Sequence, residues 1–147
     1  MTATRSFDSV GIGDSLVELA LPITRTLIAA GALASRDYQD VHHDPVLSQE
    51  RGSPDIFMNI LTTNGIVGRF VTDWSGPGGF LRRVDIRLGA PNYPDDTMVL
   101  TGEIIELRDD EFDDTRGVVD VKVTGANSIG NHVVGTVTLT LPREGSR

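Results

Sequence analysis

The sequence predicts an α+β fold in which a curved antiparallel sheet wraps around one buried helix. The helix is expected within residues 53–79, SPDIFMNILTTNGIVGRFVTDWSGPGG, where apolar residues recur at helical spacing. Only Arg69 is charged between Ile56 and Val71, so this helix must be largely buried. Alternating and β-branched residues dominate the chain from residue 79 to residue 142, a pattern typical of strands. A sheet that curves around the helix is the simplest way to cover it.

The first third of the chain predicts a strand and two short helices. Residues 17–27 begin with alternating apolar positions and predict a first strand. Residues 24–37, TRTLIAAGALASRD, predict a short helix. Residues 44–52 predict one or two further helical turns, with Asp44 as the N-cap, proline at the first helical position and Gly52 at the end.

Four strands are expected after the buried helix, in residues 79–91, 96–109, 117–128 and 131–142. The second and third of these predict a hairpin across an acidic loop, RDDEFDDTRG. We interpret this loop as a solvated hairpin tip; the alternative is a surface that binds a partner.

Composition excludes several classes of function. The chain has 147 residues, which fits a single domain over residues 1–147. Its formal net charge of −8 argues against nucleic-acid binding. No apolar run is long enough to span a membrane, and we see no secretory signal. The absence of cysteine excludes disulfides and thiolate chemistry and predicts a cytoplasmic protein.

Two of the three histidines are adjacent in the stretch ASRDYQDVHHDP, residues 34–45. It could be a solvated turn that caps a helix. It could be a metal site using His42, His43 and Asp44, although adjacent residues rarely point at one ion. It could also hold an acid–base pair, because Asp37 and His42 are separated by an irregular turn that permits them to converge on one water.

The same stretch resembles the motif of the MaoC-like, (R)-specific enoyl-CoA hydratases, which is Asp-x-Asn-Pro-x-His-x-Asp. The match is at Asp37, His42 and Asp44, with identical spacing. The chain departs from the motif at Gln39 and Asp40, where the family has Asn and Pro. The resemblance implies the hotdog fold, in which a curved sheet surrounds one central helix.

The resemblance extends over about residues 20–142. It includes the buried helix, the segment LGAPNYPDDTMVLTGEIIEL and the closing strand GNHVVGTVTLTLP. The chain is most similar to one branch, the small catalytic subunits of actinobacterial steroid side-chain enoyl-CoA hydratases. That branch implies hydration of a steroid enoyl-CoA in steroid (cholesterol) degradation. It also implies a heteromer with a larger hotdog subunit, often fused to a zinc-ribbon and OB-fold (DUF35) module; a homodimer is the alternative.

The resemblance implies a role for each residue of the site. Asp37 would activate the water, and His42 would hold it and help to protonate the α-carbon. The family's helix-start glycine corresponds to Ile56 here, so the backbone N–H of Ile56 would be the oxyanion donor. His43 should face away from the water. We expect no metal and no cofactor, since coenzyme A belongs to the substrate.

Three arginines on one predicted strand, Arg82, Arg83 and Arg87, are candidates for binding the phosphates of coenzyme A. The alternative is that they form the polar face of a half-exposed strand.

Two other functions are compatible with the same fold. A hotdog thioesterase would use an acid on or near the central helix, and none lies between Ile56 and Val71. A non-catalytic subunit that completes a partner's fold would have no reason to keep both Asp37 and His42.

Overall fold

The computed structural model describes residues 3–145. Its helices and strands follow in this order: η1 (Phe7–Ser9), β1 (Leu19–Ile23), α1 (Arg25–Ala34), η2 (Asp40–His42), α2 (Pro45–Glu50), α3 (Ile60–Ser75), β2 (Phe80–Leu88), β3 (Asp96–Asp109), β4 (Arg116–Ala126) and β5 (Asn131–Pro142). The η elements are single 3-10 turns.

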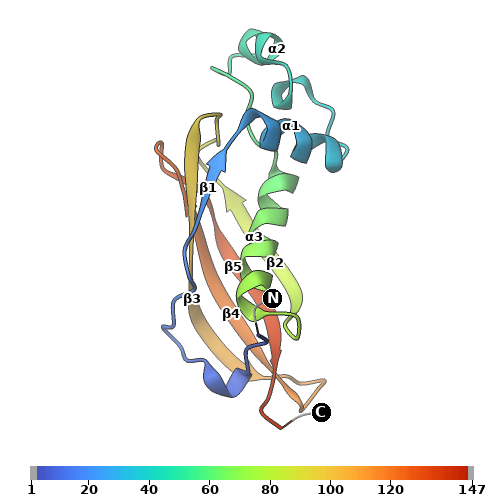
Figure 1. The fold of residues 1–147 in the computed structure, drawn as a ribbon, viewed down its shortest axis with the longest axis vertical. Coiled ribbons are helices and arrows are strands. Elements are labelled where there is room, and N and C mark those ends of the chain that lie inside the picture. Colours follow the sequence, from blue (N-terminus) through green and yellow to red (C-terminus); the bar gives the residue numbers. More distant parts are fainter. Residues whose placement is uncertain (1–2, 146–147) are drawn as a thin grey trace.

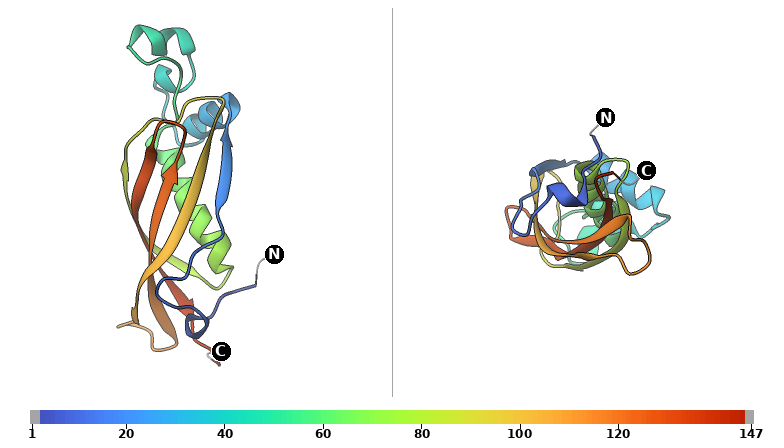
Figure 2. Two further views of the ribbon diagram at one scale, coloured as in Figure 1. Left: turned by 90° about the vertical axis from the view of Figure 1, so that its left-hand side faces the viewer. Right: turned by 90° about the horizontal axis from the view of Figure 1, so that it is seen from below.

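The strands form one five-stranded antiparallel sheet in the order β1-β3-β4-β5-β2. Helix α3 runs along one face of this sheet, and the sheet curves around it (Figures 1 and 2). The predicted α+β architecture is therefore confirmed. Strands β3 and β4 pair from Val99↔Ala126 to Asp109↔Gly117, as the predicted hairpin requires.

The core lies between α3 and the inner face of the sheet. Val67, Phe70 and Val71 on the helix are buried against residues such as Leu100 and Ile104 on β3. Alternate residues of β3 are buried, which explains why the apolar pattern of the sequence indicated a strand with one covered face.

The start of α3 differs from the prediction. The helix begins at Ile60, with Asn59 as its N-cap, and not at Ile56. The preceding residues are extended: Phe57 N–H donates to the carbonyl of Val41, and Met58 N–H donates to the carbonyl of Asn92. The helix ends at Ser75, where Gly76 takes a positive φ of 74°, as the glycines after Trp74 indicated.

The short elements before α3 follow the predicted order. Thr24 caps α1 by accepting from Leu27 N–H. Asp44 caps α2 by accepting from the N–H groups of Val46 and Leu47. The predicted cap at Asp44 is thus confirmed, and the first strand is shorter than expected.

The segment that carries η2 and α2 projects beyond the end of the sheet (Figure 1). One ion pair joins this segment to α1, and a second links η2 to the end of α2 within it. Arg25 on α1 forms a bidentate pair with Asp55, at 2.9 and 2.5 Å, and Arg51 donates to Asp40 at 2.7 Å.

Among residues 3–145, none of the helices is both long and apolar enough to cross a lipid bilayer.

Candidate active site

Asp37 is positioned by the way in which α1 ends. Arg36 adopts a left-handed conformation with φ of 58°. Its N–H donates to the carbonyl of Leu33, and the N–H of Asp37 donates to the carbonyl of Ala32 at 2.9 Å. These two bonds form a Schellman motif, which turns the chain sharply at the helix end. The backbone of Asp37 is therefore held in one conformation directly after α1.

The side chains of Asp37 and His42 converge, as the sequence predicted. His42 Nε2 lies 3.3 Å from Asp37 Oδ2. The imidazole is buried, with 7% of its side chain exposed, whereas 19% of the Asp37 side chain is exposed. The carboxylate is thus the part of the pair that solvent reaches.

The backbone sets the tautomer of His42. Its Nδ1 lies 2.7 Å from the carbonyl oxygen of Phe57, and its ring packs edge-on against the Phe57 ring at 5.0 Å. Since a carbonyl only accepts, Nδ1 donates its proton to Phe57, and Nε2 is the ring nitrogen that faces Asp37. The backbone therefore holds the imidazole with its Nε2 against the carboxylate of Asp37.

Asn59 is a site residue that the sequence analysis missed. Its Nδ2 group donates to Asp37 Oδ2 and to Ser35 Oγ, both at 3.0 Å, while its Oδ1 accepts from Thr62 N–H. This buried amide lies between the first turn of α3 and the carboxylate. The available signal was an asparagine immediately before an apolar helical run, which is a strong N-cap pattern.

Hydrogen bonds hold the pKa of the Asp37 carboxyl below its usual value. The Asn59 amide has the largest effect, with smaller contributions from the Gln39 N–H and the charge of His42. Burial acts in the opposite direction but is outweighed. The carboxylate is therefore ionised and able to accept a proton at neutral pH.

The predicted position of the oxyanion donor needs a correction. Ile56 lies before α3 in an extended segment, and its N–H donates to Asp55 Oδ1 at 2.8 Å. The N–H groups that open the helix belong to Ile60 and Leu61, and within residues 3–145 neither has an acceptor. The apolar run from Ile56 to Met58 resembled helix in sequence but is a buried extended lead-in.

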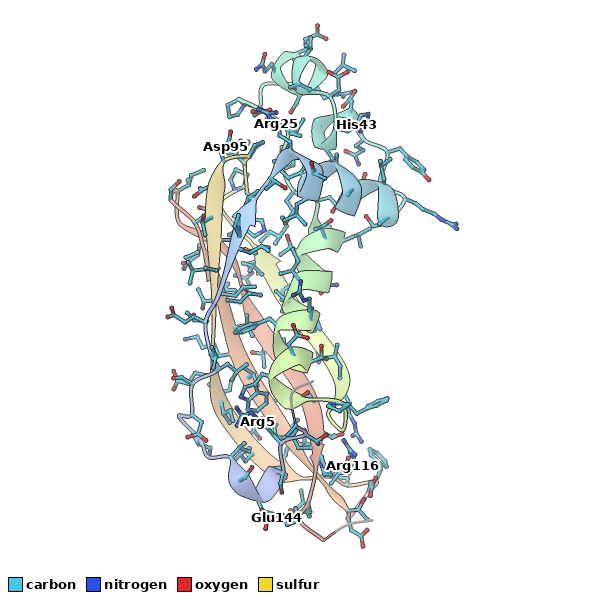
Figure 3. All side chains as sticks on the ribbon, in the orientation of Figure 1. Arg5, Arg25, His43, Asp95, Arg116 and Glu144 are labelled. Atoms are coloured by element: carbon cyan, nitrogen blue, oxygen red, sulfur yellow. The ribbon has the colours of Figure 1, made fainter. Side chains whose placement is uncertain are left out.

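His43 and Asp44 do not join His42 in a metal site. His43 is exposed and lies at the α2 end of the molecule (Figure 3). The carboxylate of Asp44 is occupied by the cap of α2. Residues 3–145 contain no group of three histidine or acidic side chains arranged to hold a metal ion.

The three candidate arginines are not gathered at the acid–base pair. Arg82 binds the buried carboxylate of Asp110 with two hydrogen bonds, at 3.2 and 2.5 Å. Asp110 follows β3 at the end of the sheet opposite α2 (Figure 1). Arg83 pairs with Asp85 on its own strand. Arg87 lies near the other end of β2 from Arg82, opposite Val134 of β5.

Solved structures with this fold include several hydratases. The TM-score is 0.82 with a MaoC-like dehydratase from Rhodospirillum rubrum, at 16% identity, over 95% of this chain and 98% of that one. It is 0.80 with an (R)-hydratase from A. caviae, at 18% identity, over 91% and 98%. These likenesses confirm the hotdog fold.

A curated relative shows the family. Over 130 residues the chain is 45% identical to the 3-oxo-4,17-pregnadiene-20-carboxyl-CoA hydratase beta subunit of Mycobacterium tuberculosis, covering 88% of this chain and 95% of that protein. The chain belongs to the MaoC-like hydratase family. A chain of the ChsH1-ChsH2 complex from the same organism is 44% identical, with a TM-score of 0.83 over 89% of this hydratase-family chain and 98% of that one. No protein-family model matches the sequence.

Proposed function

We propose that this chain is the catalytic subunit of an enoyl-CoA hydratase that adds water across the α,β double bond of a steroid side-chain acyl-CoA. The observation that carries the proposal is the ionised Asp37 carboxylate 3.3 Å from Nε2 of His42. The name of the curated relative, a hydratase of a steroid-like carboxyl-CoA, supports the substrate class.

The proposed reaction begins with a water that donates one hydrogen to Asp37 and is oriented by the adjacent His42. As its oxygen bonds to the β-carbon, Asp37 accepts a proton and the double-bond electrons move to the thioester oxygen. The Nδ1–H of His42 is donated to the carbonyl of Phe57 and does not face Asp37. The proton returned to the α-carbon is therefore the one that the pair has taken from the water, and atoms and charge balance.

The enolate oxygen needs hydrogen-bond donors. We place it at the N-terminus of α3, where the N–H groups of Ile60 and Leu61 open the helix and the positive end of the helix dipole lies. Asn59 connects the proposed oxyanion donors to the proposed base, since it caps α3 and donates to Asp37. Loss of one oxyanion donor typically lowers the rate by about 10²–10³-fold.

A partner subunit is also part of the proposal. The relative is named as a beta subunit, and a similar chain was solved in the ChsH1-ChsH2 complex. Strand β2 lies at an edge of the sheet, which favours pairing with another sheet. We infer a hetero-oligomer with a larger hotdog subunit, acting in the cytoplasm. The reaction transfers no electrons, and coenzyme A enters as part of the substrate.

The test compares the chain alone with the chain assembled with a co-encoded hotdog partner. Loss of the enoyl absorbance is followed with a steroid enoyl-CoA and with crotonyl-CoA. Turnover of the steroid thioester only by the assembly supports the proposal. Turnover of crotonyl-CoA by the chain alone would make it a homodimeric hydratase of short acyl groups.

A further inference from the structure

His132 on β5 is a buried titratable residue outside the acid–base pair. It is 2% exposed, its Nδ1 lies 2.7 Å from the carbonyl oxygen of Ala90, and its Nε2 lies 2.8 Å from Thr63 Oγ1. Because the carbonyl only accepts, Nδ1 carries the proton and Nε2 accepts from the threonine hydroxyl. Burial lowers the pKa of His132, which keeps the ring neutral and this pattern intact.

Thr63 connects this histidine to the first turn of α3. It is fully buried, and its N–H donates to the carbonyl of Asn59 at 3.2 Å. Its hydroxyl lies 3.4 Å from the same carbonyl oxygen. The bond from the hydroxyl to His132 therefore fastens the residue that closes the first helical turn to strand β5.

Met58, which precedes the N-cap residue Asn59, is also bonded at this end of the sheet. Ala90 N–H donates to the carbonyl of Asn131, next to His132, and Met58 N–H donates to the carbonyl of Asn92. Asn59 is thus held from both sides, through Met58 before it and through Thr63 after it. Its own amide reaches Asp37 at 3.0 Å.

We propose that His132 and Thr63 are positioning residues that fix the first turn of α3, and through Asn59 the orientation of the Asp37 carboxylate. They touch neither the water nor the thioester. The catalytic part of this inference rests on the proposed hydratase function. The geometric part concerns only how firmly Asn59 holds Asp37.

The test uses Thr63→Val, which keeps the shape of the side chain but removes the hydroxyl, beside Thr63→Ser, which retains it. In the assembled enzyme, Thr63→Val should lower kcat by roughly 10-fold to 100-fold with little change in KM, because misplaced catalytic groups lose rate more than binding. Thr63→Ser should recover most of the rate.

A second readout does not depend on activity. The pKa of Asp37 is followed by carbon NMR of the labelled full chain. Thr63→Val should raise it toward the ordinary carboxyl value, because a loosened Asn59 stabilises the charged form less. The groups that act on Asp37 are the amide of Asn59 on α3, the N–H of Gln39 and the imidazole of His42 on η2.

Thr140→Val is the matched control. Thr140 is fully buried on the same strand as His132, and its hydroxyl accepts from Arg116 Nε at 2.8 Å. Arg116 lies at the opposite end of the molecule from His43 (Figure 3). This variant should lose stability while kcat and the pKa of Asp37 stay unchanged.

His132→Asn is the second variant, used if Thr63→Val fails to fold. Its amide can still donate toward Ala90 but is too short to accept from Thr63, so it should raise the pKa of Asp37 as well. An unchanged Asp37 pKa in both variants, or an equal rise in Thr140→Val, would overturn the proposal. An inactive wild-type assembly would instead refute the hydratase function, and the NMR titration would still decide the positioning role.

Discussion

The carboxylate of Asp37 is kept ionised mainly by a neutral donor, the amide of Asn59, and not by an arginine. Asp40 and Asp55 in the same part of the chain also have lowered pKa values, but an arginine binds each of them. The amide of Asn59 has the largest effect on Asp37 and bonds to only one of its oxygens. A base must have a free lone pair as well as a charge, which distinguishes Asp37 from its two neighbours.

The adjacent histidines provide an internal comparison at the residue scale. His42→Ala should lower the hydration rate by about 10²–10⁴-fold, because it removes the group that shares the water with Asp37. His43→Ala should change the rate little, since His43 is exposed whereas His42 is buried. Steady-state rates of both variants check this. Equal losses would show that the wrong histidine has been assigned.

At the scale of elements, Asn59 combines two roles that substitutions can separate. Asn59→Ala removes both the cap and the bond to Asp37, and should cost about 1 kcal/mol of stability from the cap alone. Asn59→Asp keeps a cap acceptor for Thr62 but places a second carboxylate against Asp37, which should raise the pKa of one of the two. The Asn59→Asp variant should therefore keep helix α3 but lose hydratase activity. Thermal melts and rates measured together test this, and an active Asn59→Asp would contradict the account.

The packing of α1 on α3 requires a glycine at position 31. A Cβ there would lie 2.2 Å from Thr62 Oγ1 and 2.8 Å from its Cγ2, so rotation of Thr62 gives no relief. Gly31→Ala should destabilise the protein by about 1–3 kcal/mol. Gly65→Ala is the control, because nothing lies within 4 Å of its added Cβ and alanine favours helix. Denaturant unfolding compares them, and equal stabilities would contradict the packing argument.

Local signals predicted most elements, and long-range contacts explain the errors. The cap at Asp44 and the β3–β4 hairpin depend on residues close in the sequence, so the sequence pattern predicted both. The start of α3 was misplaced because a buried extended segment and a buried helix can have the same apolar run. Arg82 was a candidate for coenzyme A because its partner, Asp110, is distant in the sequence. The convergence of Asp37 and His42 was predicted, but Asn59, which comes from another element, was not.

At the scale of the whole molecule, the stability of the projecting segment that carries η2 and α2 depends on the carboxylates of Asp40 and Asp55. Asp40 and Asp55 have folded pKa values below the ordinary 3.8, so their contribution to stability is complete above that pH and is lost as the pH falls through the lowered values. Amide exchange in residues 40–58 should therefore accelerate below about pH 4 before the sheet unfolds. In Asp55→Asn the same segment should exchange faster even at neutral pH. Simultaneous opening of segment and sheet would contradict this.

Two surfaces of the described chain are left uncovered: the free edge of strand β2 and the exposed start of helix α3. Strand β2 pairs only with β5 in the described chain, and Ile60 and Leu61 are each about half exposed beside the donors assigned to the enolate. A partner and a substrate would each cover such a surface. In this proposal the catalytic residues belong to this chain, whereas the partner subunit helps to enclose the substrate.

The most direct measurement is the hydration rate of a steroid enoyl-CoA by the assembled enzyme carrying Asp37→Asn. The substitution preserves the shape of the side chain but removes the base, so the rate should fall by at least about 10²-fold while the melting temperature of the assembly changes little. An unchanged rate in a correctly assembled variant would mean that the chemistry lies outside this chain, and the assignment of Asp37 as the base would be wrong.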